Sequence, residues 1–364
     1  MNQKKFKKAF VFRIIDNYES FYNKYFWPVT NNFSKTFLKN LVREISRLVH
    51  KEESYLGLSI KIFHKWFLLE IIGWFYATCL KENFASNKIQ PKFGSEFEKL
   101  NMLQKQKIYK NNIFKTFYNH KSNFKMIPVW IKELILNLRK NKLKISESKY
   151  CFFPSELCYD HANFKNLFLK NIHPSRLFKK LEKHELEKTI SLIPQEKELI
   201  QNIFIVLKNI FLSEKQNFDP LIKEYMLIWL KISRNYFVLS YKNLKKKRLP
   251  KEIWFGSISS NIHSSLLAYT ALKKNVKTVA HDHGNGDAFH EQFANNLFEY
   301  NFCSHYFSYN SNQAKIKSQS LVKDLKFNIS KNQPKFIFNE NKQSNKQVTI
   351  KKRIKNIMYL STVL

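Results

Sequence analysis

Residues 253–292 read IWFGSISSNIHSSLLAYTALKKNVKTVAHDHGNGDAFHEQ, and this stretch decides the fold. The apolar run at 253–255 stops at Gly256, which predicts a short strand that ends in a turn. Helix-capping residues precede segment 264–274, whose apolar residues can face inward along a helix. The apolar run at 276–280 predicts a second strand. A strand, a turn, a helix and a strand within about 30 residues form a βαβ unit with parallel strands.

Further strands are predicted on both sides of this unit. Residues 150–153 form an apolar run before Pro154, and residues 302–308 form another, which a helix from Asn312 follows. Repeated strand–helix units are typical of a doubly wound α/β domain, in which ligands bind at the carboxyl ends of the strands. We therefore expect an α/β fold, in which a helix-rich N-terminal part precedes a Rossmann-like βαβ domain.

The sequence divides into four regions. Residues 1–145 are expected to be mainly helical, and residues 146–327 to form the Rossmann-like domain. Residues 328–355 are polar and predict a linker, after which residues 356–364 predict one more buried strand. We expect this strand to open a second domain that the chain lacks; the alternative is a terminal strand that completes the first sheet. Apolar periodicity predicts long helices at 35–49, 58–82, 97–117, 176–188, 195–212 and 219–241.

Glycine and histidine gather in one part of the chain. Three of the six glycines and five of the eleven histidines fall within residues 256–305, a combination that favours a ligand or catalytic site. Glycine permits sharp turns and lets backbone N–H groups approach a ligand closely. The loop after strand 276–280 begins with His281 and His283. The turn at 256–261 lies at the equivalent end of the neighbouring strand, so we expect both loops to face one cleft.

Three interpretations of this loop remain open. His283 can act as a general base that takes a proton from an acceptor hydroxyl, oriented by Asp287. His281 and His283 with a carboxylate can bind a divalent metal, although the fuller pattern of the common metallohydrolases is absent. The same residues can simply shape a turn. We favour the first interpretation, with His283 and Asp287 as catalytic residues and no metal; the expected ligand-binding residues are Gly256, Ser257, Ser259, Asn261, His281, Gly284, Gly286 and His290.

Other polar residues of this part of the chain carry weaker signals. Asn261 and His263 could contact a ligand at the first loop, but helix capping explains Asn261 equally well. A packed aromatic strand explains the side chains that flank strand 302–308, which are Cys303, His305 and Tyr309.

Charge is distributed unevenly along the chain. The formal net charge is +35, yet residues 251–310 hold four basic and five acidic residues, so the excess lies elsewhere. The densest basic run is Lys242 with residues 245–248. Three interpretations of this run remain open: it forms a solvated surface, it contacts an anionic membrane, or it contacts nucleic acid. No nucleic-acid-binding motif is present, so nucleic acid is not expected as a partner.

Cysteine spacing and hydropathy place limits on the class of protein. The four cysteines have neither disulfide nor zinc spacing and are expected to be free thiols in a reducing compartment. Residues 60–80 are the most hydrophobic stretch, but charged residues interrupt them. This predicts a buried or membrane-surface helix rather than a membrane span.

Residues 279–315, VAHDHGNGDAFHEQFANNLFEYNFCSHYFSYNSNQAK, resemble a stretch of bacterial surface-carbohydrate biosynthesis proteins. These include capsule and lipopolysaccharide glycosyltransferases and CDP-glycerol glycerophosphotransferases of the two-domain GT-B type. In such proteins a strand ends in a His-Gly loop, often preceded by Gln. His283 and Gly284 match that pair, Asp282 stands where Gln is usual, and residues 286–287 match the loop that follows. The resemblance implies that His283 faces the active cleft beside the acceptor.

The last residues extend this resemblance. Residues 351–364, KKRIKNIMYLSTVL, are similar to the first strand of the second GT-B domain, which binds the nucleotide part of the donor. The resemblance thus implies the N-terminal half of a GT-B protein, truncated at the start of its second domain and inactive alone if that domain is required.

The family implies a function in surface polysaccharide assembly. Such a protein transfers a sugar or polyol phosphate from a nucleotide-sugar donor to a saccharide or lipid-linked acceptor, with no separate cofactor. It acts in the cytoplasm, at the inner face of the plasma membrane, where a basic surface contacts anionic lipid. The alternative is a non-catalytic basic protein that binds an anionic membrane or nucleic acid.

Overall fold

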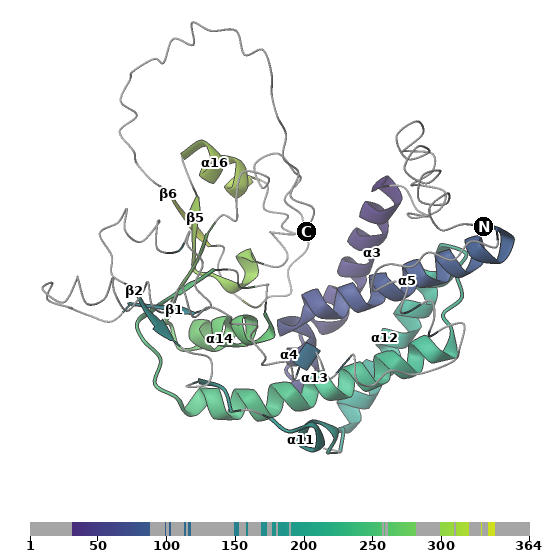
Figure 1. Cartoon of the computed structure of the whole chain (residues 1–364), viewed down its shortest axis with the longest axis horizontal. Coiled ribbons are helices and arrows are strands. Elements are labelled where there is room, and N and C mark those ends of the chain that lie inside the picture. Colours follow the sequence, from purple (N-terminus) through teal and green to yellow (C-terminus); the bar gives the residue numbers. More distant parts are fainter. Residues whose placement is uncertain are drawn as a thin grey trace, which may run out of the picture.

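Figure 1 shows a sheet with α14 (Ile262–Lys273) and α16 (Ser311–Gln319) beside it, together with a group of longer helices. The computed structural model describes residues 31–87, 99, 102, 113, 116–117, 149–152, 158, 169–172, 177–179, 181–188, 191–256, 258, 261–281, 299–308, 311–319, 329 and 334–338.

The described strands form one parallel sheet. Its neighbours follow the order β2-β1-β3-β4-β5-β6, and each adjacent pair is parallel. The register aligns Trp254 with Val279 and Val279 with His305. The expected α/β fold with a parallel sheet is therefore confirmed. The strands are β1 (Lys149–Phe152), β2 (Leu169–Ile172), β3 (Glu252–Phe255), β4 (Lys277–His281), β5 (His305–Ser308) and β6 (Lys335–Phe338).

The strand order reverses direction once. The chain passes from β1 outward to β2, returns across β1 to β3, and then adds β4, β5 and β6 on the other side. In open parallel sheets, ligands bind in the crevice at the carboxyl ends of the strands where the order reverses. The carboxyl ends of β1 and β3 mark that position in this chain.

The long helices begin and end at residues that suit those positions. Pro194 and Pro220 occupy the first turns of α12 and α13, where the missing backbone N–H costs nothing. Asp219 caps α13 by accepting a hydrogen bond from Leu221 N at 2.8 Å. The helices are α3 (Asn31–Val49), α4 (Tyr55–Ile62), α5 (His64–Asn87), α11 (Lys183–Glu187), α12 (Pro194–Ser213), α13 (Pro220–Lys246), α14 (Ile262–Lys273) and α16 (Ser311–Gln319), with a 3₁₀ turn, η3, at Tyr300–Phe302.

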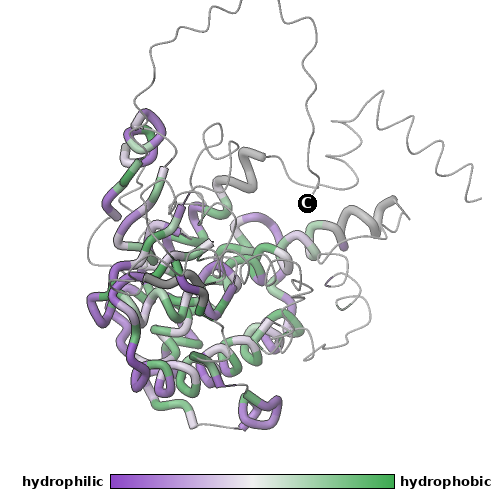
Figure 2. Tube along the Cα trace, turned by 60° about the vertical axis from the view of Figure 1, so that its left-hand side comes forward, coloured by the Kyte–Doolittle hydropathy of each residue, from purple (hydrophilic) through white to green (hydrophobic). Residues whose placement is uncertain are grey.

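Helices from distant parts of the sequence share one core. α3 and α4 pack against α12 and α13, and α13 also contacts α14 beside the sheet. Trp229 of α13 lies 5.2 Å from Phe67 of α5, and His64 stacks on Phe302 at 5.7 Å, measured between ring centroids. Helices of region 1–145 are thus packed against helices of region 146–327. Figure 2 shows hydrophobic and hydrophilic residues following one another along the helical parts of the chain, as expected where a helix buries one face.

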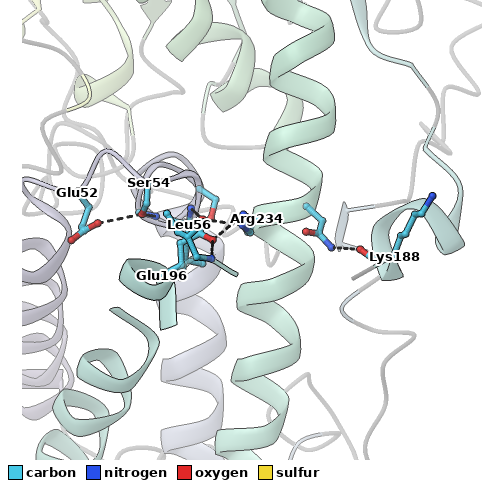
Figure 3. A network of polar contacts seen from close by, with 10 residues as sticks. Glu52, Ser54, Leu56, Lys188, Glu196 and Arg234 are labelled. Carbon is cyan, nitrogen blue, oxygen red and sulfur yellow. Dashed lines mark hydrogen bonds and ion pairs between the residues drawn. The ribbon is translucent and has the colours of Figure 1, made fainter. Parts of the chain in front are cut away.

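A buried ion pair joins three of these helices (Figure 3). The Glu196 carboxylate of α12 is fully buried and pairs with Arg234 of α13, with Oε1 2.9 Å from Nε and Oε2 2.8 Å from Nη2. The same carboxylate accepts hydrogen bonds from Leu56 N of α4 at 3.1 Å and from Ile193 N at 3.2 Å. One side chain therefore caps the N-termini of two helices and neutralises a cation on a third.

The opposite face of the sheet carries a second, smaller apolar cluster. Its residues come from five strands and from the segment after β1, and all but Ile337 are buried. They are Cys158, Leu169, Trp254, Val279, Phe307 and Ile337.

The structure corrects three details of the expected fold. β2 was not expected, and β6 falls within residues 328–355, which the sequence assigns to a linker, so 335–338 belong to the sheet instead. Within the expected helix 176–188, the continuous described helix is only α11. β2 and β6 are the two edge strands. β2 has Lys170 and Asn171 between its two apolar residues, which weakens its apolar signal, whereas the apolar run of β6 is short and lies within a polar segment. The expected strand at 356–364 lies outside the described residues.

The turn between α14 and β4 follows the sequence closely. Asn275 has a φ of 55°, the left-handed conformation that asparagine tolerates better than most residues. Val276 N then donates to Ala271 O at 2.8 Å and closes the helix end. The predicted end of the helix near residue 274 is confirmed.

Candidate functional site

The described parts of both predicted loops meet the carboxyl edge of the sheet. Gly256 follows β3, Asn261 precedes α14, and His281 is the last residue of β4. Because β3 and β4 are parallel neighbours, these segments lie at the same edge, beside the position where the strand order reverses.

Ile258 anchors the turn at 256–261. Its side chain is buried, its N–H donates to Glu299 Oε2 at 3.0 Å, and its carbonyl accepts from Ser265 Oγ at 3.1 Å. Glu299 is itself buried just before η3. The Glu299 carboxylate therefore already accepts a hydrogen bond from Ile258 N–H, a backbone donor that could otherwise bind an anion. Because the N–H of Ile258 is already paired, it is not the group that a ligand would use.

Asn261 acts as the cap of α14. Its Oδ1 accepts from His263 N at 2.8 Å and lies 2.7 Å from His263 Nδ1. The His263 ring is buried and meets Phe178 and Tyr236 edge-on, with centroids 4.7 Å and 5.8 Å away. The capping interpretation of Asn261 is thus confirmed, and aromatic packing accounts for His263.

His281 forms a buried contact with a thiol. His281 Nε2 lies 3.1 Å from Cys158 Sγ, and both side chains have no exposed surface. Cys158 belongs to the segment between β1 and β2, so the contact crosses β3 to reach β4. His281 lies on the sheet face of the smaller cluster, and it holds the base of the loop that contains His283.

Two serines at the carboxyl edge were missed by the sequence analysis. Ser264 lies in the first turn of α14, and Ser308 ends β5. Both side chains are fully buried, and neither Oγ has a hydrogen-bond partner in the structure, as far as the chain is described. A buried hydroxyl without a partner costs free energy, so a ligand or water that bonded to it would be stabilised. The only signal in the sequence was the number of serines near the start of the helix, and helix capping explains these serines as well as ligand binding does.

Two residues near β5 do not belong to this site. Burial raises the pKa of the Cys303 thiol well above its usual value, so the thiol stays protonated. Burial, with the nearby Lys277, lowers the pKa of His305. His305 is the first residue of β5 and therefore lies at the amino edge of the sheet, opposite the predicted cleft. Tyr309 lies outside the described residues.

Most of the predicted catalytic loop lies outside the described residues. This applies to His283 and Asp287 as catalytic residues, and to Ser257, Ser259, Gly284, Gly286 and His290 as ligand-binding residues. Within the described part of the chain, no three His, Cys, Asp or Glu side chains gather as a metal site requires.

Replacing Cys158 by Val is expected to lower the free energy of unfolding by about 1–3 kcal/mol, because it removes the hydrogen bond to buried His281. Cys158→Ser keeps a hydroxyl in hydrogen-bonding position and should cost less. Urea unfolding followed by tryptophan fluorescence measures both. Equal losses in the two variants would show that the thiol only fills space.

Comparisons of the chain with protein families, with curated proteins and with solved structures found no match. In the described ranges, no helix combines the length and apolar character needed to cross a bilayer.

Proposed function

We propose that this chain is a glycosyltransferase-like protein of surface polysaccharide assembly, with its acceptor site at the carboxyl edge of the sheet. The supporting observation is the reversal of strand order at β1 and β3, beside which the turn at 256–261 and the end of β4 lie. Ligand sites of open parallel sheets occupy this position. The activity class comes from the resemblance of residues 279–315, and the finer proposal is that the sheet corresponds to the N-terminal half of a GT-B protein.

His283 carries the chemistry in this proposal. It takes the proton of the acceptor hydroxyl as the acceptor oxygen bonds to the transferred sugar carbon, or to phosphorus in a polyol phosphate. The bond from that atom to the nucleotide phosphate breaks, and the nucleotide leaves with the electron pair. Asp287 orients His283 by accepting a hydrogen bond from its other ring nitrogen.

The described residues provide the frame for this reaction. Glu299 and Ser265 hold Ile258 in place between β3 and α14 through two hydrogen bonds. The N-terminus of α14 favours negative charge, and buried Ser264 Oγ lies in its first turn. A phosphate at this position would interact with the N-terminus of α14, and a phosphate or an acceptor hydroxyl could form a hydrogen bond with Ser264 Oγ.

The test is release of nucleotide from activated donors. The full chain is incubated with CDP-, UDP- and GDP-activated sugars and with CDP-glycerol, with and without a lipid-linked saccharide extract from polysaccharide-producing bacteria. Acceptor-dependent release of a nucleotide from one donor supports the proposal. If no donor is consumed and none is retained on the immobilised chain, the proposed transfer is wrong for this chain.

The location proposed with this function is the cytoplasm, at the inner face of the plasma membrane. Subcellular fractionation checks it: the chain should sediment with membranes at low salt and leave them at high salt, because a peripheral electrostatic contact is screened.

A further inference from the structure

Nine basic residues meet at the amino edge of the sheet, and we call this surface the basic edge. Seven are exposed, while Lys274 and Lys277 are half-buried. Within segments 242–252 and 273–277 the single acidic residue is Glu252. The nine residues are Lys242, Lys245, Lys246, Lys247, Arg248, Lys251, Lys273, Lys274 and Lys277.

Hydrogen bonds join the segments of the basic edge into one surface. Lys274 Nζ, just after α14, donates to Lys247 O at the end of α13 at 2.6 Å. Lys277 N donates to Lys251 O at 3.0 Å, where β4 and β3 begin. The ends of two helices and the starts of two strands therefore lie together. This edge is opposite to the carboxyl edge that holds the candidate site, because β3 and β4 run parallel between them.

The single acidic residue does little to offset this charge. Glu252 is buried, and its carboxylate accepts from Trp254 Nε1 at 2.7 Å while it lies 3.4 Å from Lys277 Nζ. Its charge is thus directed inward and is shared with one lysine. Seven of the nine cations are exposed, and the exposed carboxylate of Glu53 interacts with Tyr269, the tyrosine beside Lys273.

Tyrosines border the basic edge. Lys273 Nζ lies 5.6 Å from the ring centroid of Tyr269, which contacts Tyr241 at 5.7 Å. Tyr241 stacks on Phe237, and Phe237 contacts Tyr55, which is 41 % exposed. Tyr269 itself is buried and Tyr241 is half-buried, so Tyr55 is the exposed member of this group. An exposed tyrosine suits the interface of a membrane with water, because its ring is apolar and its hydroxyl polar.

We propose that the basic edge docks on the surface of an anionic phospholipid membrane. Eight of its nine cations are lysines, which are compact, hydrated charges suited to a diffuse layer of headgroups. The basic edge has one arginine, Arg248, and therefore only one guanidinium group that could bind a phosphate or a base through two parallel hydrogen bonds. Clusters of four to eight basic residues on one surface attract anionic lipid with a free energy that grows with each cation. This contact does not depend on the proposed enzymatic activity, although it would supply the peripheral membrane location proposed with it.

The experiment measures co-sedimentation of the full chain with vesicles. One set contains phosphatidylcholine alone, and the other contains phosphatidylcholine with phosphatidylglycerol. The test variant carries Lys245→Gln, Lys246→Gln, Lys247→Gln and Arg248→Gln. The matched control loses the same charge from exposed positions on α12, on α13 and after α11, through Lys188→Gln, Lys197→Gln, Lys208→Gln and Lys231→Gln.

We expect the unchanged chain to bind the anionic vesicles and not the neutral ones. The test variant should bind between about tenfold and about 1000-fold more weakly. The control should remain within about threefold, because charges beyond the Debye length of about 8 Å at physiological salt are screened. Circular dichroism verifies that both variants are folded.

Several results would overturn the proposal. These are equal binding to neutral and anionic vesicles, equal weakening in the test and control variants, or no vesicle binding at all. Binding of duplex RNA or DNA that the test variant loses, without vesicle binding, would assign the basic edge to nucleic acid. If the test variant does not fold, the salt dependence of the unchanged chain decides: binding that persists at high salt contradicts an electrostatic contact.

Discussion

Replacing Glu196 by Gln is expected to lower the free energy of unfolding by about 3–5 kcal/mol, because it leaves Arg234 charged and buried without a counter-ion. Both side chains are almost fully buried, at 0 % and 4 % exposure, so water cannot solvate the cation that remains. The amide can still accept from Leu56 N, so the loss comes from charge rather than from an empty space.

Urea unfolding monitored by tryptophan fluorescence measures this loss. Glu198→Gln, an exposed neighbour on the same helix, is the control and should change stability by less than about 0.5 kcal/mol. The double variant Glu196→Gln with Arg234→Met removes both charges and should recover most of the loss. A Glu196→Gln variant as stable as its control would mean that the ion pair contributes nothing to the fold.

Replacing His283 by Ala is expected to reduce acceptor-dependent nucleotide release by about 10²–10⁴-fold, the usual contribution of a general base. The substitution removes the group that accepts the hydroxyl proton, while donor binding should change little. The measurement compares initial rates under saturating donor and acceptor.

His184→Ala is the matched control, because His184 is an exposed histidine on α11 that the proposed reaction does not use. It should retain the full rate. A His283→Ala variant with an unchanged rate would exclude His283 as the base, even if the chain proves to be a transferase. No release from the unchanged chain would instead exclude the proposed function itself.

The sequence predicts best those helices and strands whose ends are marked by glycine, asparagine or proline. β3, α14 and β4 were predicted within about two residues, because Gly256, Asn261 and Asn275 set their limits. α12 and α13 begin at prolines, and both starts were predicted within one residue, but α13 continues to Lys246, five residues beyond its predicted end at 241. The expected helix at 58–82 is divided, since α4 ends at Ile62 and α5 begins at His64. Apolar periodicity continues through that break and conceals it.

The contacts that shape the candidate site could not be predicted in the same way. Glu299 reaches Ile258 across 41 positions of the sequence, and His281 reaches Cys158 across 123. No local pattern marks either pair, because the partners meet only once the sheet has formed. The sequence identified the correct edge of the sheet for Gly256, Ile258 and Asn261, but it did not indicate that Glu299 and Ser265 bond to Ile258.

During synthesis, α3 and α4 leave the ribosome well before the helices that cover them. Leu56 and its partner Glu196 are 140 positions apart, so the apolar faces of α3 and α4 stay uncovered while the intervening chain is made. Apolar surface exposed in this way favours aggregation and recruits chaperones. The yield of this protein in cells is therefore expected to follow chaperone supply and the rate of translation, and not only the stability of the finished molecule.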